Sequence, residues 1–439
     1  MTQNEAFDLL KLGYNIYITG PAGSGKTHLL NKYIKFLQSK NASVGITAST
    51  GIAATHMDGI TIDSWSGIGL KDHLTDKDLQ EILSKRYLRD RFTTTKVLII
   101  DEVSMLHAAK LDMLDTILKS ARKTDAPFGG IQIVLSGDFF QLPPYSQNRV
   151  EADFIFKSRV WSKMDLKICY LGVSYRQKDT ALLKILNAIR ENDITPEILS
   201  ILENKVQTGE IDRSITPTKL YTHNIDVDAI NNSELEKIPE ESQSYTMYSM
   251  GEEGLVAMIK RSCLAPENLV LKKGALIMFV RNNFEKGYVN GTLGKVEGFD
   301  SDRNPIVKTA DGKKINVEYA KWTITENNKT RAEVSQIPLR LAWAITVHKS
   351  QGMTLSAAEI DLTKSFLLGM GYVALSRVRS LSGIRLLGFN NIALQVNPEI
   401  VEKDYEFRKE STMVVNEIRK MSFLSKFLMR RKFRYFLTS

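Results

Sequence analysis

The chain has 439 residues, of which 43% are hydrophobic, and carries 59 Lys and Arg against 50 Asp and Glu, a formal net charge of +9. This length predicts about two to four domains with apolar cores. No apolar run is long enough to span a membrane, the first residues show no signal or transit peptide, and the two cysteines lack metal-ligand spacing. We therefore expect a protein of a reducing, cytoplasmic compartment, without a disulfide framework or zinc module.

The positive charge is concentrated at one end. From Ile418 to Ser439 the sequence holds seven basic residues and no acidic one, so the rest of the chain carries only +2 of the net +9. The net charge alone is weak evidence for nucleic-acid binding. The tail predicts either an amphipathic helix packed on the second domain or an auxiliary DNA grip, and both stay open.

The first strong motif follows a short β-type run, Ile16 to Thr19, and precedes a helical pattern. It fits G-x-x-x-x-G-K-[ST], the phosphate-binding loop, whose glycines let backbone N–H groups point at phosphate oxygens. In this chain the loop is Gly20-Pro21-Ala22-Gly23-Ser24-Gly25-Lys26-Thr27. Lys26 is expected to reach the β- and γ-phosphates and Thr27 to ligate Mg²⁺. Gln3, in a short predicted helix upstream, can lie over the bound base, although such a glutamine is usually a plain surface residue.

A second strand, Ser43 to Ala48, leads into small and polar residues that suit contacts with a second phosphate chain. The candidates are Thr50, Gly51, Ile52, Ala53, His56, Ser64 and Trp65. His56 and Trp65 can stack on bases or sugars. A structural loop with a tryptophan packed in the core explains the same spacing equally well, and this alternative stays open.

Lys96 to Met105 predicts a buried parallel strand that ends in Asp101 and Glu102. After a phosphate loop, such a pair indicates hydrolysis: Asp101 holds Mg²⁺ and Glu102 deprotonates the attacking water. The next buried strand, Ile131 to Leu135, is followed by Gln141, which is placed to sense the γ-phosphate. These loops all follow strands, so we expect ligands at the carboxyl ends of one parallel sheet.

The second half predicts another α/β unit. Between its parts, residues 268–337 change to alternating patterns with many turns, which favour a small antiparallel barrel or sheet. Arg176 and Arg377 follow strand-like or helical apolar segments there, and an arginine supplied by a second domain can stabilise transition-state charge.

Together these segments resemble the Pif family (petite-integration-frequency) of DNA helicases, superfamily 1B, from Gln3 to about Leu387. The most specific part lies between Ser104 and Pro144, where SML and LD precede PFGGIQIVLSGDFFQLPP. This part distinguishes the Pif family from RecD-type and Dda-type relatives.

The resemblance implies two tandem RecA-like P-loop domains. The first covers 1–171, with a small insertion at about 66–95, and the second covers 172–267 and 338–400. The β-rich insertion covers 268–337 and a basic helical tail 401–439. The resemblance also implies roles for the candidates. Gln3 would contact adenine, and Arg176 and Arg377 would be trans-domain phosphate contacts. The catalytic residues would be Lys26, Thr27, Asp101, Glu102 and Gln141. DNA contacts are implied for Thr50, Gly51, Ile52, Ala53, His56, Ser64, Trp65, Asn224, His348, Lys349, Ser350 and Gln351.

The implied function is ATP- and Mg²⁺-dependent, DNA-stimulated unwinding with 5′-to-3′ translocation on single-stranded DNA. Single-stranded and tailed or forked duplex DNA are the implied partners, with G-quadruplexes and RNA–DNA hybrids as further candidates, in replication, repair and telomere maintenance. We expect a monomer in action, nucleoid-associated in a prokaryote. The alternatives are a translocase of RecD or Dda type, or one that moves without separating strands, and a small-molecule phosphotransferase using the same loop.

Overall fold

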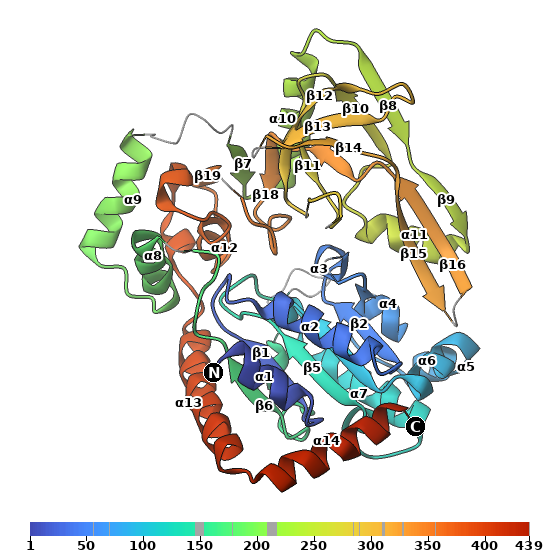
Figure 1. Cartoon of the computed structure of the whole chain (residues 1–439). Coiled ribbons are helices and arrows are strands. Elements are labelled where there is room, and N and C mark those ends of the chain that lie inside the picture. Colours follow the sequence, from blue (N-terminus) through green and yellow to red (C-terminus); the bar gives the residue numbers. More distant parts are fainter. Residues whose placement is uncertain are drawn as a thin grey trace. The chain divides into compact units, whose positions relative to one another are not determined.

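The computed structural model describes residues 1–55, 57–69, 71–144, 153–177, 179–208, 217–283, 285–288, 290–309, 312–326, 329–355 and 357–438. The chain forms two compact units (Figure 1). Unit 1 contains Met1–Arg176 together with Asn397–Ser439, and unit 2 contains Gln177–Val396.

Unit 1 is built on a six-stranded parallel sheet with the order β3-β2-β4-β5-β1-β6. Its strands are β1 (Ile16–Thr19), β2 (Val44–Ala48), β3 (Ile60–Thr61), β4 (Val97–Asp101), β5 (Gln132–Ser136) and β6 (Lys167–Tyr170). One row of paired residues crosses its centre through Ile46, Ile99, Val134 and Ile16. Every residue of β1, β4 and β5 is buried, which is why these strands are continuous apolar runs.

Helices cover this sheet and connect its strands. They are α1 (Gln3–Leu10), α2 (Lys26–Gln38), α3 (Gly51–Thr55), α4 (Ile62–Ser66), α5 (Asp76–Ser84), α6 (Arg86–Thr94) and α7 (Ala108–Arg122). The short helices α5 and α6 occupy the stretch expected to be a small insertion.

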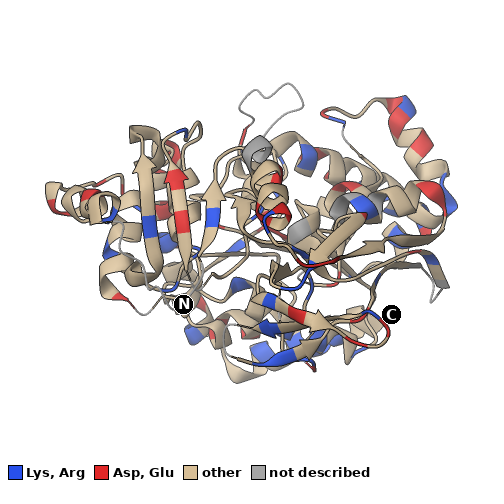
Figure 2. Ribbon diagram, turned by 90° about the horizontal axis from the view of Figure 1, so that it is seen from above, with Lys and Arg blue, Asp and Glu red and all other residues tan. Residues whose placement is uncertain are grey.

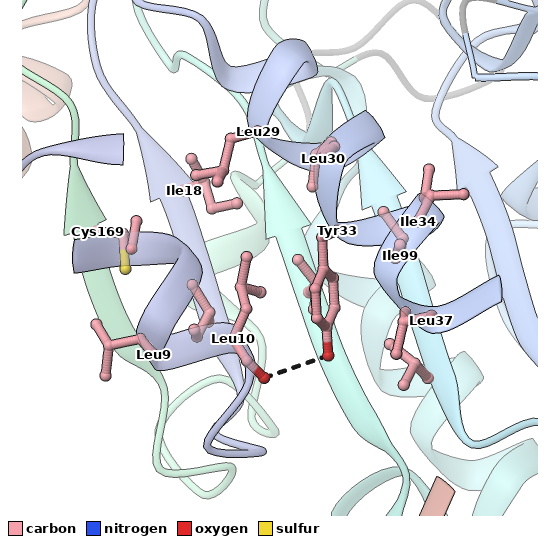
Figure 3. Close-up of a cluster of buried hydrophobic side chains, with 14 of the residues drawn as sticks. Leu9, Leu10, Ile18, Leu29, Leu30, Tyr33, Ile34, Leu37, Ile99 and Cys169 are labelled. Atoms are coloured by element: carbon pink, nitrogen blue, oxygen red, sulfur yellow. Dashed lines mark hydrogen bonds between the residues drawn. The ribbon is translucent and has the colours of Figure 1, made fainter. Parts of the chain in front are cut away.

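The packing of α1 and α2 on the sheet is seen in Figure 3, where leucines of both helices surround Ile18 and Ile99. Tyr33 of α2 is fully buried there, and its hydroxyl lies 3.2 Å from the Leu10 carbonyl oxygen and 2.6 Å from Gln132 Oε1. Gln132 Nε2 donates to the Leu10 carbonyl oxygen at 3.1 Å. Because a buried polar group without a partner is costly, this small network fixes α1 and α2 against β5.

The C-terminal helices α13 (Pro398–Lys420) and α14 (Phe423–Thr438) belong to unit 1. α13 runs along β6, where Ser411 Oγ accepts from the Tyr170 amide at 3.0 Å and Tyr170 donates its hydroxyl to Asp404 at 3.2 Å (Figure 1). Phe433 and Leu437 of α14 enter the core of the unit. The prediction that the tail packs on the second domain is therefore wrong: α13 covers the edge strand β6, and α14 packs into the core of unit 1. No helix in the described part of the chain is long and apolar enough to cross a membrane.

Unit 2 contains a four-stranded parallel sheet with the order β18-β7-β19-β20. Its strands are β7 (Thr218–Tyr221), β18 (Ala344–Thr346), β19 (Ala358–Leu362) and β20 (Ile384–Phe389), and its helices are α8 (Thr180–Arg190), α9 (Pro196–Thr208), α10 (Asn224–Glu236) and α12 (Met370–Leu375). A central row of this sheet pairs Ile345, Leu220, Ile360 and Leu386. The fold class expected from the sequence, two parallel α/β sheets, is confirmed.

The antiparallel part of unit 2 consists of three sheets with the orders β10-β8, β14-β13-β12-β11-β17 and β15-β16-β9. The bounds are β8 (Ser242–Thr246), β9 (Tyr248–Gly251), β10 (Asn268–Lys272), β11 (Leu276–Phe279), β12 (Leu293–Phe299), β13 (Pro305–Thr309), β14 (Lys314–Asn316), β15 (Ala320–Glu326), β16 (Lys329–Gln336) and β17 (Leu339–Leu341), with α11 (Glu253–Ser262). Antiparallel pairing thus begins at Ser242, before the stretch 268–337 in which it was expected. The earlier strands are short and mostly exposed, so they lack the alternating apolar pattern that marks a strand in a sequence.

Candidate nucleotide and DNA sites

The phosphate loop joins β1 to α2. Gly20 and Gly25 have φ angles of 138° and 85°, which favour glycine. A Cβ on Gly20 would lie 2.2 Å from the Leu171 carbonyl oxygen, and one on Gly25 would lie 2.1 Å from Gln3 Nε2. The Leu171 backbone leaves no room for a side chain at position 20. At position 25 the positive φ disfavours one, and a Cβ there would displace the end of the Gln3 side chain.

Lys26 is the first residue of α2 and folds back over the loop. Its Nζ donates to the carbonyl oxygens of Gly20 at 2.8 Å and Pro21 at 3.1 Å. The ammonium is thus held at the mouth of the loop, beside the N-terminus of α2, where the helix dipole also favours an anion. Phosphate oxygens are stronger acceptors for it than neutral carbonyls.

Asp101 and Glu102 lie at the carboxyl end of β4. Burial raises the pKa of the Asp101 carboxyl, while the neighbouring Ser136 and Thr27 hydroxyls, the Glu102 amide and the Lys26 ammonium act in the opposite direction. Asp101 thus faces both Lys26 and Thr27 of the phosphate loop. A buried carboxylate beside a threonine hydroxyl is an oxygen-ligand set that suits Mg²⁺.

Glu102 has a left-handed backbone, with φ 52° and ψ 44°, which is uncommon for a residue other than glycine. Its amide donates to Asp101 Oδ1 at 2.9 Å, and its carbonyl oxygen accepts from Ser49 Oγ at 2.6 Å and from the Met105 amide at 3.3 Å. The conformation turns the chain sharply at the end of β4. Strain of this kind concentrates at functional sites.

Gln141 follows β5, the neighbour of both β1 and β4 in the sheet. Its side chain is only 5% exposed, and its Oε1 has no hydrogen-bond partner among the described residues. A buried amide oxygen without a partner is costly in a folded protein. It is therefore an acceptor available to a ligand or to a water molecule beside one.

Gln3 and Tyr175 border the loop from two sides. Gln3 Nε2 donates to the Ser24 carbonyl oxygen at 3.2 Å, and the Tyr175 amide donates to the Gly23 carbonyl oxygen at 2.8 Å. The Tyr175 side chain is 63% exposed, and its ring would lie 3.7 Å from a Cβ on Gly25. Tyr175 was not among the predicted site residues, because only the folded chain shows that this aromatic residue next to Arg176 reaches the phosphate loop.

Arg176 is half-buried and is the last residue of unit 1 along this stretch. Arg377 lies within unit 2 and is only 1% exposed. It donates from Nε to the Val373 carbonyl oxygen at 2.8 Å and from NH2 to Ser376 Oγ at 2.8 Å. Gln177, also buried, donates from Nε2 to the Ser376 and Val378 carbonyl oxygens at 2.8 and 3.2 Å, so it holds the turn that carries Arg377.

The candidate DNA residues of unit 1 lie after β2 and on α3 and α4. Thr50 Oγ1 accepts from the Ala53 amide at 3.2 Å, and Ser64 Oγ accepts from the Thr61 hydroxyl at 2.7 Å. Ala53 packs into the core. Gly51 begins α3; His56 lies outside the described residues, and of Ile52 only the backbone of α3 is described.

The Trp65 prediction needs correction. The indole is 4% exposed, packs with its centroid 5.4 Å from that of Phe92, and would lie 2.8 Å from a Cβ on Gly45. Its ring thus fills space between β2 and α6 and does not face a base. The core-packed alternative explains this residue.

In unit 2 the candidates gather after β7 and β18. The His348 ring is stacked on that of Phe366, with 6.3 Å between the ring centroids. The centroid of the His223 ring lies 5.1 Å from that of the same phenyl ring. Burial, with the neighbouring His223, lowers the pKa of His348, which favours a neutral ring at neutral pH. Phe366 is 49% exposed. His223 and Phe366 were not predicted as site residues. They are distant in the sequence, and their rings come into contact only once the sheet has formed.

The remaining candidates of unit 2 have structural contacts. Ser350 is buried and donates to the Val347 carbonyl oxygen at 2.7 Å, and Gln351 is buried as well. The Lys349 amide donates to Thr346 Oγ1 at 3.2 Å, and burial lowers the pKa of its ammonium. Asn224 is the first residue of α10, and its side chain lies outside what the structure describes. The fold and the loop geometry thus define a P-loop NTPase with two parallel α/β sheets.

Comparison with known proteins places the chain within this class. The model of the PIF1-like helicase family matches residues 2–212, and that of the DNA helicase Pif1 2B domain matches residues 255–299. The ATP-dependent DNA helicase Pif1 of Psychrobacter sp. is 43% identical, over 93% of this chain and 71% of the relative.

Two crystal structures of Bacteroides Pif1 are similar over most of both chains. The complex with ADP-AlF4 gives a TM-score of 0.81 at 30% identity, covering 93% of this chain and 96% of the other. The complex with ssDNA gives a TM-score of 0.66 at 31% identity, with the same coverage. The chain belongs to the PIF1-like helicase family. It is an ATP-dependent DNA helicase, as the resemblance of its motifs implied.

Proposed function

We propose that the chain translocates 5′ to 3′ on single-stranded DNA and unwinds the duplex ahead of it, using Mg²⁺ and ATP bound at the phosphate loop. The observation that carries the proposal is the grouping of the half-buried Lys26 and Thr27 around the buried carboxylate of Asp101. Beside it, Gln141 offers an amide oxygen without a partner among the described residues. This donor set suits a nucleoside triphosphate with its metal and has no evident structural purpose without them.

In the proposed mechanism Lys26 exchanges the Gly20 and Pro21 carbonyls for β- and γ-phosphate oxygens. Thr27 and Asp101 would hold Mg²⁺, which neutralises phosphate charge when it is bound. Glu102 accepts the proton of the attacking water, and Gln141 Oε1 accepts a hydrogen bond that orients this water. Gln3 and Tyr175 border the loop where the adenine of the nucleotide would lie.

Arg176 and Arg377 are proposed to stabilise the charge that develops on the γ-phosphate when the units close on ATP. The Val373 carbonyl oxygen and the Ser376 hydroxyl are neutral acceptors of Arg377, and a charged phosphoryl oxygen is a stronger acceptor for a guanidinium than either. Hydrolysis removes this anion and releases the arginine. The closed arrangement of the units then loses a stabilising contact, so each hydrolysis favours their reopening.

For DNA, we propose backbone contacts by the loop Thr50 to Ala53 and by Ser64. In unit 2, the exposed Phe366 and its two histidine neighbours offer a surface on which a base can stack. Asn224, Lys349 and Gln351, which follow β7 and β18 in the sequence, are proposed as further DNA contacts. We further propose action as a monomer, associated with the nucleoid if the source is a prokaryote. G-quadruplexes and RNA–DNA hybrids are proposed as additional substrates because the same single-strand track would lead into them.

Unwinding of 5′-tailed and 3′-tailed duplexes of equal length, with ATP and Mg²⁺, tests the proposal. We expect unwinding only with the 5′ tail, and a rise in ATPase activity when single-stranded DNA is added. Strand separation from the 3′ tail alone would contradict the polarity. DNA-stimulated ATPase activity without separation of either duplex would instead indicate a translocase.

Lys26→Ala and Glu102→Gln are the matched variants for the chemical step. Each is expected to abolish unwinding while single-stranded DNA binding stays within about twofold, because neither residue belongs to the proposed DNA surface. Anisotropy with a labelled oligonucleotide measures the binding. Full unwinding by either variant would remove the roles assigned here.

A further inference from the structure

The outward face of α14 exposes several large apolar side chains. Phe433 and Leu437 of this helix are buried in unit 1, yet Phe423, Phe427 and Tyr435 are 86%, 52% and 76% exposed. Leu424 and Leu428 are exposed beside them. The helix therefore has apolar residues on two faces, and only one of them has a protein partner among the described residues.

The order of these residues along α14 is regular. Phe423, Phe427, Arg431 and Tyr435 follow one another at intervals of four, so they form one ridge of the helix with a rise of about 6 Å per step. The neighbouring ridge at the same interval is Lys426, Arg430 and Arg434. An aromatic ridge thus runs alongside a cationic ridge.

Most of the cations on this face have no ion-pair partner in the part of the chain that the structure describes. α14 contains five basic residues and no acidic one, whereas both basic and acidic residues occur across the ribbon as a whole (Figure 2). Arg430 is paired with Asp8 at 3.0 Å. Lys426, Arg431, Lys432 and Arg434 have no ion pair with any described residue. Such a surface attracts a polyanion.

Aromatic rings beside unpaired cations are the combination that binds single-stranded nucleic acid, since bases stack on the rings while cations follow the phosphates. Guanidinium groups such as Arg431 also stack on bases. Because the chain is a DNA helicase, we propose that the outward face of α14 is an auxiliary binding surface for single-stranded DNA on unit 1. This surface would bind DNA in addition to the residues proposed to contact DNA during translocation, and the proposal rests on that proposed function.

Two full-length variants test the surface. In Phe423→Ala/Phe427→Ala/Tyr435→Ala the three rings are removed; in Arg431→Ser/Arg434→Ser two cations are removed. We expect the first to bind a labelled single strand about tenfold or more weakly. We expect the second to flatten the slope of log K against log salt concentration by about 1.4. Lys35→Ser/Lys123→Ser removes two exposed cations elsewhere in unit 1 and should leave the slope unchanged.

A Tyr435→Trp variant gives a local readout, because a base stacked on the new indole quenches its fluorescence beyond that of the unchanged protein. Unaltered affinity of the triple variant, or equal slopes for the two cation pairs, would overturn the proposal. So would binding of phosphatidylserine vesicles that depends on the three rings while DNA affinity does not. Unwinding by the unmodified chain is measured in parallel, so a failure of the auxiliary surface is distinguished from a failure of the helicase assignment.

Discussion

Gln177 is predicted to affect catalysis through its contacts, beyond its effect on stability. Its buried amide donates to the carbonyl oxygens of Ser376 and Val378, on either side of Arg377. In Gln177→Leu these carbonyls lose their donor, at a cost of roughly 1–3 kcal/mol of stability. We expect kcat for DNA-stimulated ATP hydrolysis to fall by about a hundredfold with little change in KM, because a displaced arginine acts on the transition state and not on bound ATP.

Gln336→Leu is the matched control for this prediction. Gln336 is also a buried glutamine of unit 2, and its Nε2 donates to the carbonyl oxygens of Tyr245, Pro266 and Glu267. Its loss should lower thermal stability to a similar extent but leave kcat near its original value. Equal losses of kcat in both variants would assign Gln177 a merely structural role.

At this scale the sequence identifies residues whose chemistry follows from a fixed local pattern. The phosphate loop, and the carboxylates after β4, depend on neighbours within a few positions, so their spacing carries the information. The role of Trp65 does not follow from such a pattern, because the sequence does not show whether a tryptophan ring is exposed or buried. Its contacts with Gly45 and Phe92, which are distant in the sequence, decide that it is buried. Tyr175 and Phe366 were missed for the same reason, since their partners are distant in sequence.

Helix α14 shows the corresponding limit at the scale of an element. Its composition indicated a basic helix with apolar positions, but apolar residues occur on two sides and cannot say which side faces the protein. Phe433 lies against Gly13, where a Cβ would come within 2.7 Å of the phenyl ring. This close approach fixes the helix to unit 1. Its partner, Gly13, lies far from residues 418–439, so the sequence of that segment alone cannot predict the contact.

The two faces of α14 should respond differently to the same substitution. Phe433→Ala removes a buried ring and is expected to destabilise unit 1 by about 3–5 kcal/mol. Phe423→Ala removes a ring that is 86% exposed and should change stability by no more than about 0.5 kcal/mol. Urea denaturation of both variants measures the difference. A larger loss for Phe423→Ala than for Phe433→Ala would mean that the helix packs on its other face. Deleting the whole tail would expose the core, so it is a poor test of DNA binding.

For the whole molecule, the alternation of strands and helices was sufficient to predict two parallel α/β sheets. Parallel strands are buried on both faces and therefore appear as continuous apolar runs. The tail could not be assigned in this way, because unit 1 recruits Asn397–Ser439 from the far end of the chain. The antiparallel strands before residue 268 were missed because they are exposed and short.

The division into units also predicts how nucleotide binding distributes over the molecule. Lys26, Thr27, Asp101, Glu102 and Gln141 all belong to unit 1, whereas Arg377 belongs to unit 2. ADP with Mg²⁺ should therefore slow hydrogen exchange in unit 1 peptides around the phosphate loop, by up to about 2.7 kcal/mol at a hundredfold excess over Kd. It should leave the segment 371–379 unchanged, because ADP lacks the γ-phosphate on which the arginine would act.

ADP with aluminium fluoride restores an anion at the γ position and is expected to protect the segment 371–379 in addition. In Arg377→Ala this added protection should be lost while that of the phosphate loop remains. Protection of both segments by ADP alone would contradict the division of labour, because it would mean that unit 2 responds to the nucleotide before the γ-phosphate is present. A γ-specific response is what a helicase requires, since only a contact made and broken in each cycle of hydrolysis can be converted into a step along DNA.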